Sequence, residues 1–143
     1  MQKKQHVHFI GIGGSGMSAI ARIMLELGYH VTGSDLKTSA ASERLEALGA
    51  ICSLGHAEEN LEGADLVVAS TAIPPANVEL LKAREKGLRI MHRGEMLAWL
   101  MRRQKGIAIA GAHGKTTTTS MVSTILARGG LDPTMVIGGK LAS

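Results

Sequence analysis

Aromatic residues are almost missing from this chain, which has one Phe, one Tyr and one Trp, or 2% of its 143 residues. Proteins that bind single-stranded nucleic acid stack bases on aromatic side chains, and the scarcity of such side chains excludes that mode of binding. The single cysteine, Cys52, excludes an internal disulfide. Because it lies in an apolar run, we expect a buried and inert thiol rather than a reactive one.

Long apolar runs and a strong charge of one sign are also lacking. No run approaches the length of a signal-peptide core or a membrane span, so we expect a soluble cytoplasmic protein with no membrane partner. The formal net charge is +4, and basic residues cluster only at Arg102-Arg103-Gln104-Lys105. This cluster suits a solvated helix end or linker better than a nucleic-acid patch, since basic residues favour helix C-termini. We therefore expect anionic small ligands and no nucleic acid.

What the chain does have is a regular alternation of short apolar runs and amphipathic stretches, often separated by glycine. It predicts strands at 7–10, 30–33, 50–54, 66–70 and 89–91, and helices at 17–27, 42–48, 76–86 and 95–103. Leu45 and Leu48 should both point inward from their helix. The alternation is typical of an α/β fold, here a Rossmann-like parallel sheet with helices on both faces.

Residues 1–104 account for one complete domain, and a new unit begins after them. A strand at 106–110, a phosphate loop and a helix over 115–128 are the elements with which a second nucleotide-binding domain would open. The chain is long enough to bury a sizeable core but short for two complete domains of this kind. We therefore expect residues 105–143 to be the start of an incomplete second domain.

Gly11, Gly13 and Gly16 form a G-x-G-x-x-G loop between the first strand and the first helix. The first glycine permits a tight turn, the second lets the backbone approach a diphosphate, and the third allows close packing of helix on strand. The helix N-terminus attracts phosphate through its free N–H groups and dipole. Asp35 ends the second strand, where a ribose-binding acid belongs. A glycine turn without a ligand, with Asp35 as a cap or turn residue, remains the structural alternative.

Polar residues follow several other predicted strands, and the carboxyl ends of parallel strands meet at one edge of the sheet. His56 follows the third strand, Ser70 and Thr71 follow the fourth, and the stretch His92-Arg93-Gly94-Glu95 follows the fifth. We expect these residues to line the same crevice as the glycine loop.

A second glycine loop, Gly111-Ala112-His113-Gly114-Lys115-Thr116, resembles a shortened G-x-x-x-x-G-K-[ST] motif. Lys115 supplies a positive charge for β- and γ-phosphates, and the Thr116 hydroxyl can join the shell of a Mg²⁺ ion. His113 could contact phosphate or only cover the loop. A chance Gly-Lys-Thr turn is the alternative, but the consecutive threonines 116–119 are poor helix formers and favour a ligand.

Together these motifs make the chain similar to the N-terminal part of the Mur ligases. The motifs are Gly11-Ile-Gly-Gly-Ser-Gly-Met-Ser18, Gly33-Ser34-Asp35, Gly55-His56, Ser70-Thr71-Ala72-Ile73 with the prolines after it, His92-Arg93-Gly94-Glu95 and Ala112-His113-Gly114-Lys115-Thr-Thr-Thr118. The resemblance covers essentially the whole chain. It is greatest to the family member that joins L-alanine to UDP-N-acetylmuramate in peptidoglycan synthesis, with ATP and Mg²⁺ as cofactors.

The resemblance implies two sets of site residues. Those around the UDP-sugar are Gly11, Gly13, Gly14, Ser15, Gly16, Met17, Asp35, His56, Ser70, Thr71, Ala72, Ile73, His92, Arg93 and Glu95. Those around ATP are Gly111, Ala112, His113, Gly114, Lys115, Thr116 and Thr117, with Lys115 and Thr116 catalytic and Thr116 also a Mg²⁺ ligand.

In such ligases ATP phosphorylates the substrate carboxylate, and the amine of alanine attacks the acyl phosphate. The rest of the ATP-binding domain and a C-terminal domain are needed for this reaction, and we therefore expect the chain alone to bind the UDP-sugar without catalysing. Its unpartnered last helix should fray, fold back on the first domain or pair with a second molecule.

Three other interpretations remain. A nicotinamide-dependent dehydrogenase would account for the first loop and Asp35, but not for Gly-Lys-Thr. A non-enzymatic nucleotide sensor would need no Lys115–Thr116 pair. A Mur ligase that takes another substrate is the third. The loop Gly13-Gly14-Ser15-Gly16-Met17 favours the alanine-adding member, but the amino-acid pocket lies beyond residue 143, so the choice of amino acid rests on the resemblance alone.

Overall fold

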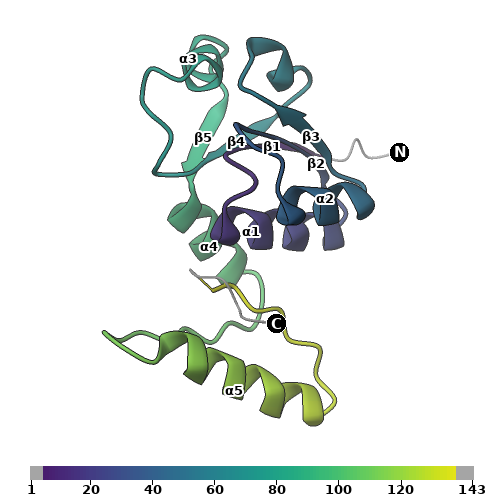
Figure 1. The fold of residues 1–143 in the computed structure, drawn as a ribbon, viewed down its shortest axis with the longest axis vertical. Coiled ribbons are helices and arrows are strands. Elements are labelled where there is room, and N and C mark those ends of the chain that lie inside the picture. The colour runs from purple at the N-terminus through teal and green to yellow at the C-terminus, as the bar shows by residue number, and fades with distance from the viewer. Residues whose placement is uncertain (1–4, 138–143) are drawn as a thin grey trace.

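A five-stranded parallel sheet forms the centre of the protein in the computed structural model, which describes residues 5–137 (Figure 1). The strand order is β3-β2-β1-β4-β5, and every neighbouring pair runs parallel. The strands are β1 (His6–Ile10), β2 (His30–Asp35), β3 (Ile51–Leu54), β4 (Leu66–Ala69) and β5 (Arg89–His92). The predicted parallel Rossmann-like sheet is thereby confirmed.

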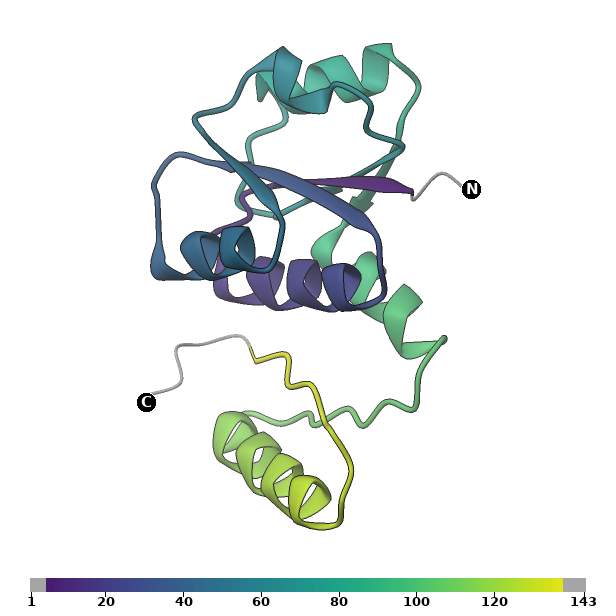
Figure 2. The ribbon, with the colours of Figure 1, turned by 90° about the vertical axis from the view of Figure 1, so that its right-hand side faces the viewer.

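Helices cover both faces of this sheet, as Figure 2 shows. One face carries α1 (Ser15–Glu26), α2 (Ala40–Ala47) and α4 (Arg93–Met101), and the other carries α3 (Val78–Glu85) and the 3₁₀ helix η1 (Glu58–Leu61). Successive side chains of a strand point to opposite faces. In β1, Phe9 accordingly joins the core beneath α1 while Ile10 joins the smaller core beneath α3.

The central strands are the most apolar because both of their faces are covered. Every residue of β1 and of β4 is buried, whereas the edge strands β3 and β5 are partly exposed. A short run such as Leu-Val-Val-Ala in β4 is typical of a strand between two helical layers. The glycine loop therefore follows a strand whose residues are all buried.

Helix α2 ends one residue earlier than its apolar pattern suggests. It begins with a capping box between Ser39 and Ser42, and it buries Leu45 at 3% exposure. Leu48 is the C-cap and is 54% exposed, so the expectation that it points inward is wrong. The chain turns away at Gly49, whose φ of 104° is left-handed, before the helix can carry Leu48 to the core.

Cys52 is half-buried in β3, and its Sγ lies 3.8 Å from the carbonyl oxygen of Ser42. Burial raises the pKa of this thiol to about 11, with a smaller contribution from the charge of Glu46. The reactive thiolate form is therefore scarce at neutral pH, in agreement with the expected inert thiol.

The described segment after α4 adds no strand to the sheet and no helix to its two faces. Residues 106–110 pair with no strand in the described part of the chain, so the strand expected there is not formed. A strand needs a neighbour to satisfy its backbone groups, and the sheet edge at β5 does not extend to this segment. Helix α5 (Lys115–Arg128) follows and buries no residue. Both views place it beyond α1 and α4, away from the sheet (Figures 1 and 2).

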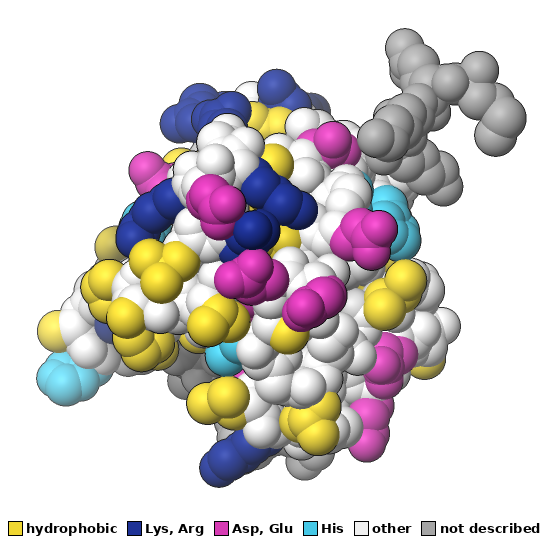
Figure 3. Space-filling model, turned by 90° about the horizontal axis from the view of Figure 1, so that it is seen from above, with side chains coloured by type: hydrophobic (Ala, Val, Ile, Leu, Met, Phe, Trp, Pro, Cys, Tyr) yellow, Lys and Arg dark blue, Asp and Glu magenta, His cyan; other side chains and the backbone are white. Residues whose placement is uncertain are grey.

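The surface over α3 and η1 carries acidic and basic side chains mixed together, as the view from above shows (Figure 3). Lys82 on α3 pairs with Glu58 at 3.3 Å and with Glu85 at 3.1 Å. Exposed pairs of this kind add little to stability and mark an ordinary solvated surface. Between residues 5 and 137, no helix combines the length and the apolar character needed to cross a bilayer.

Candidate functional site

The glycine loop after β1 is held in place by the end of β2. The amides of Gly11 and Ile12 donate to the carbonyl oxygen of Ser34 at 2.8 and 3.1 Å. Gly11 adopts a φ of 85°, which favours glycine, and a Cβ there would lie 3.4 Å from both Ile73 and Ser70. The turn is therefore fixed by backbone bonds on one side and by the 70–73 turn on the other.

Helix α1 starts from this loop with free backbone donors. Gly14 is the N-cap and contributes no side-chain cap, and its carbonyl oxygen accepts from Ser18 at 2.8 Å. Within the described residues, the amides of Ser15, Gly16 and Met17 donate to no protein acceptor. Such a group of N–H donors at the positive end of a helix is a binding site for a phosphate or another anion.

Arg93, the first residue of α4, adds a positive charge beside these amides. A Cβ built on Gly16 would overlap Nη1 of Arg93 and lie 3.1 Å from its Cδ, so the arginine side chain crosses directly over Gly16. Arginine presents several N–H donors in a plane that matches phosphate oxygens. The start of α1 and the start of α4 together form a cationic corner at the carboxyl edge of the sheet.

Asp35 lies at the end of β2 beside the loop, and part of its bonding capacity serves the loop itself. Its Oδ2 accepts from the Gly13 amide at 2.9 Å, and its Oδ1 lies 3.4 Å from the Lys37 amide. A Cβ on Gly13 would stand 3.0 Å from both Asp35 Oδ2 and Ser39 Oγ. Asp35 therefore stabilises the loop conformation, and ribose binding by its remaining oxygen lone pairs stays a prediction.

The turn after β4 also reaches the loop. The Ile73 amide donates to the Ser70 carbonyl oxygen at 3.1 Å, and the Ala72 amide donates to Ser70 Oγ at 3.3 Å. Ile73 is half-buried against the core beneath α3, while Thr71 and Ala72 are exposed. The turn thus presents two exposed residues at its tip and packs Ile73 against Gly11.

Among the residues after β5, Arg93 is the one that the structure brings onto the glycine loop. Glu95 instead bonds to its own helix start, where its Oε2 accepts from the His92 amide at 2.7 Å. That contact satisfies one of the free donors of α4 and gives Glu95 a capping role. His92 and Glu95 are both exposed, and contact with a ligand stays a prediction for each.

His56, after β3, is anchored in a buried polar network that the sequence does not reveal. Its Nδ1 lies 2.9 Å from Ser34 Oγ and 3.3 Å from Oε2 of Glu79. The Glu79 side chain is fully buried, and its Oε2 accepts from Ser34 Oγ at 2.6 Å. Sequence reasoning missed Glu79 because an acidic residue in the first turn of a helix is typical of an exposed helix start.

The other oxygen of Glu79 ties down the segment that carries His56. Its Oε1 accepts from Asn60 Nδ2 at 2.7 Å and from the Ala57 amide at 3.3 Å, and Asn60 Nδ2 also donates to the Gly55 carbonyl oxygen at 3.2 Å. Burial alone would raise the pKa of Glu79, but the side chains of His8, Ser34 and Asn60 outweigh it and lower this pKa to about 2. The carboxylate is therefore charged at neutral pH.

Two further histidines extend this network through β1. His8 Nε2 lies 3.5 Å from Glu79 Oε2 and forms no hydrogen bond, while its Nδ1 is 2.7 Å from Thr32 Oγ1. His6 Nε2 lies 2.8 Å from the same Thr32 oxygen. Burial lowers the pKa of His6 from 6.5, and this effect outweighs a hydrogen bond with the backbone of Gly63, which raises it. A line of close polar side chains thus runs through the sheet from His6 to His56, with no hydrogen bond at the step from His8 to Glu79.

The second glycine loop has the geometry of a helix-start anion site but lies apart from the first (Figure 1). Gly114 is the N-cap of α5 with a left-handed φ of 77°. Lys115 Nζ folds back over the loop and donates to the Gly111 carbonyl oxygen, and it lies 3.5 Å from the carbonyl oxygen of Ala112. The loop is exposed throughout, and His113 is exposed as well. A helix start with a lysine folded over it can bind an anion such as phosphate.

The threonines that open α5 do not all behave alike. Thr119 Oγ1 donates to the Lys115 carbonyl oxygen at 2.7 Å, so its hydroxyl serves the helix itself. The hydroxyls of Thr116 and Thr117 make no hydrogen bond within the described residues. Thr116 is therefore the threonine next to Lys115 whose hydroxyl is available to a metal ion.

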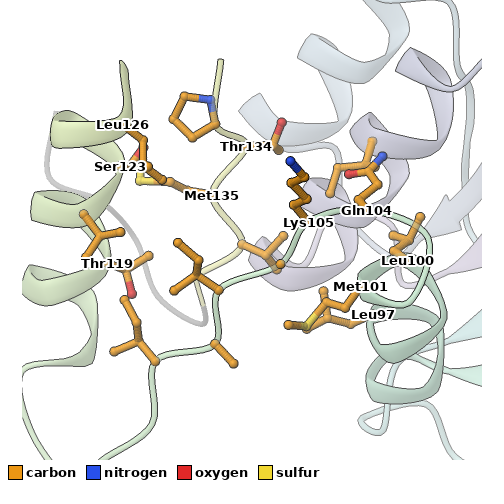
Figure 4. Close-up of a pocket in the computed structure, with 18 of the residues that line it drawn as sticks. Leu97, Leu100, Met101, Gln104, Lys105, Thr119, Ser123, Leu126, Thr134 and Met135 are labelled. Carbon is orange, nitrogen blue, oxygen red and sulfur yellow. The ribbon is translucent and has the colours of Figure 1, made fainter. Parts of the chain in front are cut away.

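A cavity of about 420 Å³ separates α5 from the first unit (Figure 4). Leu97, Leu100 and Met101 point into it from α4, and Thr119, Ser123 and Leu126 line it from α5. Residues 132–136 return along it, and Val136 packs against the core beneath α4. The cavity is mostly apolar and contains none of the predicted site residues, so it is a packing gap between two units rather than the ligand site.

Comparisons with known proteins agree with this arrangement. Residues 6–105 match the family described as "Mur ligase family, catalytic domain". The chain is 72% identical over 142 residues to the UDP-N-acetylmuramate--L-alanine ligase of Pelotomaculum thermopropionicum, covering 99% of this chain and 31% of that protein. The chain therefore spans about a third of the length of the curated relatives that it matches.

Two solved structures share the fold over nearly the whole chain. The UDP-N-acetylmuramate-alanine ligase MurC of Thermotoga maritima superposes with a TM-score of 0.88 at 34% identity, covering 95% of this chain and 32% of that one. The UDP-N-acetylmuramate:L-alanyl-gamma-D-glutamyl-meso-diaminopimelate ligase of Neisseria meningitides gives 0.87 at 33% identity, covering 96% and 44%. The two named substrates differ, so the shared fold does not select the group that is added.

Proposed function

Because this chain belongs to the Mur ligase family, we propose that it is the N-terminal part of an ATP-dependent ligase that joins L-alanine to UDP-N-acetylmuramate. The observation that carries the proposal is the set of free amides at Ser15, Gly16 and Met17, with the Arg93 side chain lying over Gly16. The 72% identity to an alanine-adding ligase supports the choice of substrate. ATP and nucleotide sugars are cytoplasmic compounds, and the proposal places the protein in that compartment.

Residues 1–104 are the proposed UDP-sugar domain. The amides at the start of α1 and the guanidinium of Arg93 would hold the diphosphate, because both donate to anionic oxygens at the same corner. Asp35, His56 and the 70–73 turn surround this corner from β2, β3 and β4. They would hold the uridine half of the ligand, with Asp35 near the ribose.

Residues 105–143 are the proposed start of the ATP-binding domain. The backbone at Gly111 and Gly114 would cradle phosphate, Lys115 would neutralise its charge, and the free Thr116 hydroxyl would join the Mg²⁺ shell. When bound, ATP supplies the phosphoryl group that activates the substrate carboxylate. The task of Lys115 and Thr116 is to position that group and screen its charge.

Titration calorimetry tests the diphosphate site directly. We expect the chain to bind UDP-N-acetylmuramate and UDP, and to bind NADH no better than buffer. Arg93→Ala should weaken UDP binding by roughly tenfold or more, since it removes a charged donor to the diphosphate. Arg22→Ala is the matched control, because Arg22 lies on α1 but its side chain is 62% exposed and pairs with Glu26 on the same helix. NADH binding with no response to UDP would refute the proposal and favour a dehydrogenase.

A further inference from the structure

One buried carboxylate collects polar side chains from elements that lie far apart in the sequence. Glu79 lies in the first turn of α3, and its side chain has no exposed surface. It accepts hydrogen bonds from Ser34 at the end of β2 and from Asn60 in η1. A carboxylate can only accept, so the direction of both bonds is fixed.

These directions determine which nitrogen of His56 carries the proton. Ser34 Oγ has one hydrogen, and it points to Glu79 Oε2 at 2.6 Å. The Ser34 oxygen must therefore accept the bond from His56 at 2.9 Å, which requires a hydrogen on Nδ1. Glu79 Oε2 lies 3.3 Å from the same nitrogen. Because this oxygen is also an acceptor, it too favours a hydrogen on Nδ1. In the neutral ring, Nε2 is left with a lone pair.

The opposite nitrogen of His56 is open to solvent. His56 follows β3 at the carboxyl edge of the sheet, the edge that carries the glycine loop. Its side chain is 12% exposed, and Nε2 has no hydrogen-bond partner in the described residues. Across those residues, His8 Nε2 is the buried side-chain atom without a partner, so the unbonded Nε2 of His56 reaches solvent.

We propose that Glu79 is a positioning residue of the nucleotide site, which acts through Ser34 to hold His56 with its Nδ1 hydrogen inward and its Nε2 lone pair toward the ligand. The proposal deepens and rests on the proposed function, since it names the group that His56 offers to the uridine half. The fitting ligand atom is a donor, either the imide N–H of uracil or a ribose hydroxyl. Cytosine has a lone pair where uracil has this N–H and cannot supply the same bond.

Conformation and charge of Glu79 both suit this role. The Ala57 amide and Asn60 bond its second oxygen, so the carboxylate fixes the backbone next to His56 as well as the ring. Because its pKa is lowered to about 2, Glu79 is an ionised acceptor at neutral pH. A glutamine in its place could accept through one atom only and would present an N–H group to a donor.

The test uses the whole 143-residue chain and two matched variants, Glu79→Gln and Glu85→Gln. Glu85 lies on the same helix, but its side chain is 70% exposed and pairs with Lys82. Long-range ¹H–¹⁵N spectra of the histidine rings report the tautomer of His56, which is assigned by its loss in His56→Asn. Calorimetry with UDP and with CDP then measures binding.

We expect the Nδ1–H tautomer in the wild-type chain and in Glu85→Gln, and a mixture with the Nε2–H tautomer in Glu79→Gln. UDP binding should weaken by roughly three- to tenfold in Glu79→Gln alone. A preference for UDP over CDP that disappears in this variant identifies the uracil imide as the donor, and an equal loss for both identifies the ribose.

Two results would overturn the proposal. One is a wild-type His56 that carries its neutral-form proton on Nε2, which needs no variant and decides the matter even if Glu79→Gln does not fold. The other is a Glu79→Gln chain that loses the Nδ1–H tautomer but binds UDP as the wild type does. A wild-type chain that binds neither UDP nor UDP-N-acetylmuramate refutes the proposed function instead, and the spectra still decide the orientation of His56.

Discussion

At the scale of single residues, three glycines in and beside the loop keep space for particular neighbours. A Cβ on Gly16 would overlap Arg93, and a Cβ on Gly13 would crowd Asp35. A Cβ on Gly33 would lie 2.5 Å from Ile12 Cδ1 and 2.9 Å from the Phe9 carbonyl oxygen. Ile12 is fully buried on this glycine. The loop therefore depends on a glycine in β2 that lies outside the G-x-G-x-x-G motif.

Glu79 makes a residue-scale prediction about acid stability. Its pKa is about 2 in the folded protein against an ordinary 4.5, so the unfolded chain binds the proton more readily. The carboxylate therefore contributes stability in full above pH 4.5, and this contribution is lost as the pH falls toward 2. A difference of this size corresponds to about 3 kcal/mol. His6, with its pKa lowered from 6.5, acts in the same direction and destabilises the fold as the pH falls below that value.

Urea unfolding of the wild-type chain and of Glu79→Gln at a series of pH values between 7 and 3 checks this. The difference in unfolding free energy between the two should shrink steadily as the pH falls below about 4.5. Glu85→Gln should follow the wild type at each pH, because its carboxylate is exposed. A gap between wild type and Glu79→Gln that stays constant down to pH 3 would contradict the low pKa.

At the scale of elements, the strands and helices of the first unit could be predicted because each carries its own local signal. Strand β4 is a continuous apolar run, and α1 is an amphipathic stretch that ends at a glycine. The position of Arg93 after β5 placed it at the correct edge of the sheet, although its lean over Gly16 depends on packing. The Glu79 network could not be predicted, since Ser34 lies 45 residues away in the sequence and Asn60 lies 19 away.

The strand expected at 106–110 failed for a different physical reason. Its composition, Gly-Ile-Ala-Ile-Ala, has the apolar character of a strand. Strand formation also requires a neighbouring strand, and no described segment pairs with it. Ile107 is 64% exposed as a result. A local pattern indicates what a segment can form, and the presence of a partner decides whether it does.

We therefore expect α5 to be less stable than α1, the other long helix in the described residues. It buries no residue, and Met121 and Ile125 are 60% and 67% exposed. A helix of this length without packing is marginal in water. We expect its amides to exchange with deuterium roughly a hundredfold or more faster than those of α1, which serves as an internal control with six buried residues. Equal protection of the two helices would show that α5 is covered, for example by a second copy of the chain.

At the scale of the whole molecule, the strand order brings the proposed ligand residues together. In the order β3-β2-β1-β4-β5, the chain leaves β1 with β2 on one side and β4 on the other. The carboxyl edge of the sheet at such a point is where ligands bind in open α/β sheets. Asp35 ends β2, while His56, Ser70 and Arg93 follow β3, β4 and β5, and all four meet the Gly11–Gly16 loop or its support. The second loop, carried by α5, lies apart from this edge.

The separation of the two loops leads to a prediction about activity. The chain spans 31% of the length of its relative from Pelotomaculum thermopropionicum. The apolar cavity beside α5 and the exposed residues of that helix leave the proposed ATP loop, Gly111–Thr116, without a surrounding domain in the described part of the chain. Positioning contributes most of the catalysis in phosphoryl transfer, and a loop free to move relative to the substrate cannot provide it. We therefore expect the chain to bind UDP-N-acetylmuramate but to release no phosphate above background when ATP, Mg²⁺ and L-alanine are added.

The full-length relative serves as the positive control in the same phosphate assay. Phosphate release that depends on L-alanine and disappears in Lys115→Ala would contradict this prediction, because it would show that residues 105–143 already form a working ATP site.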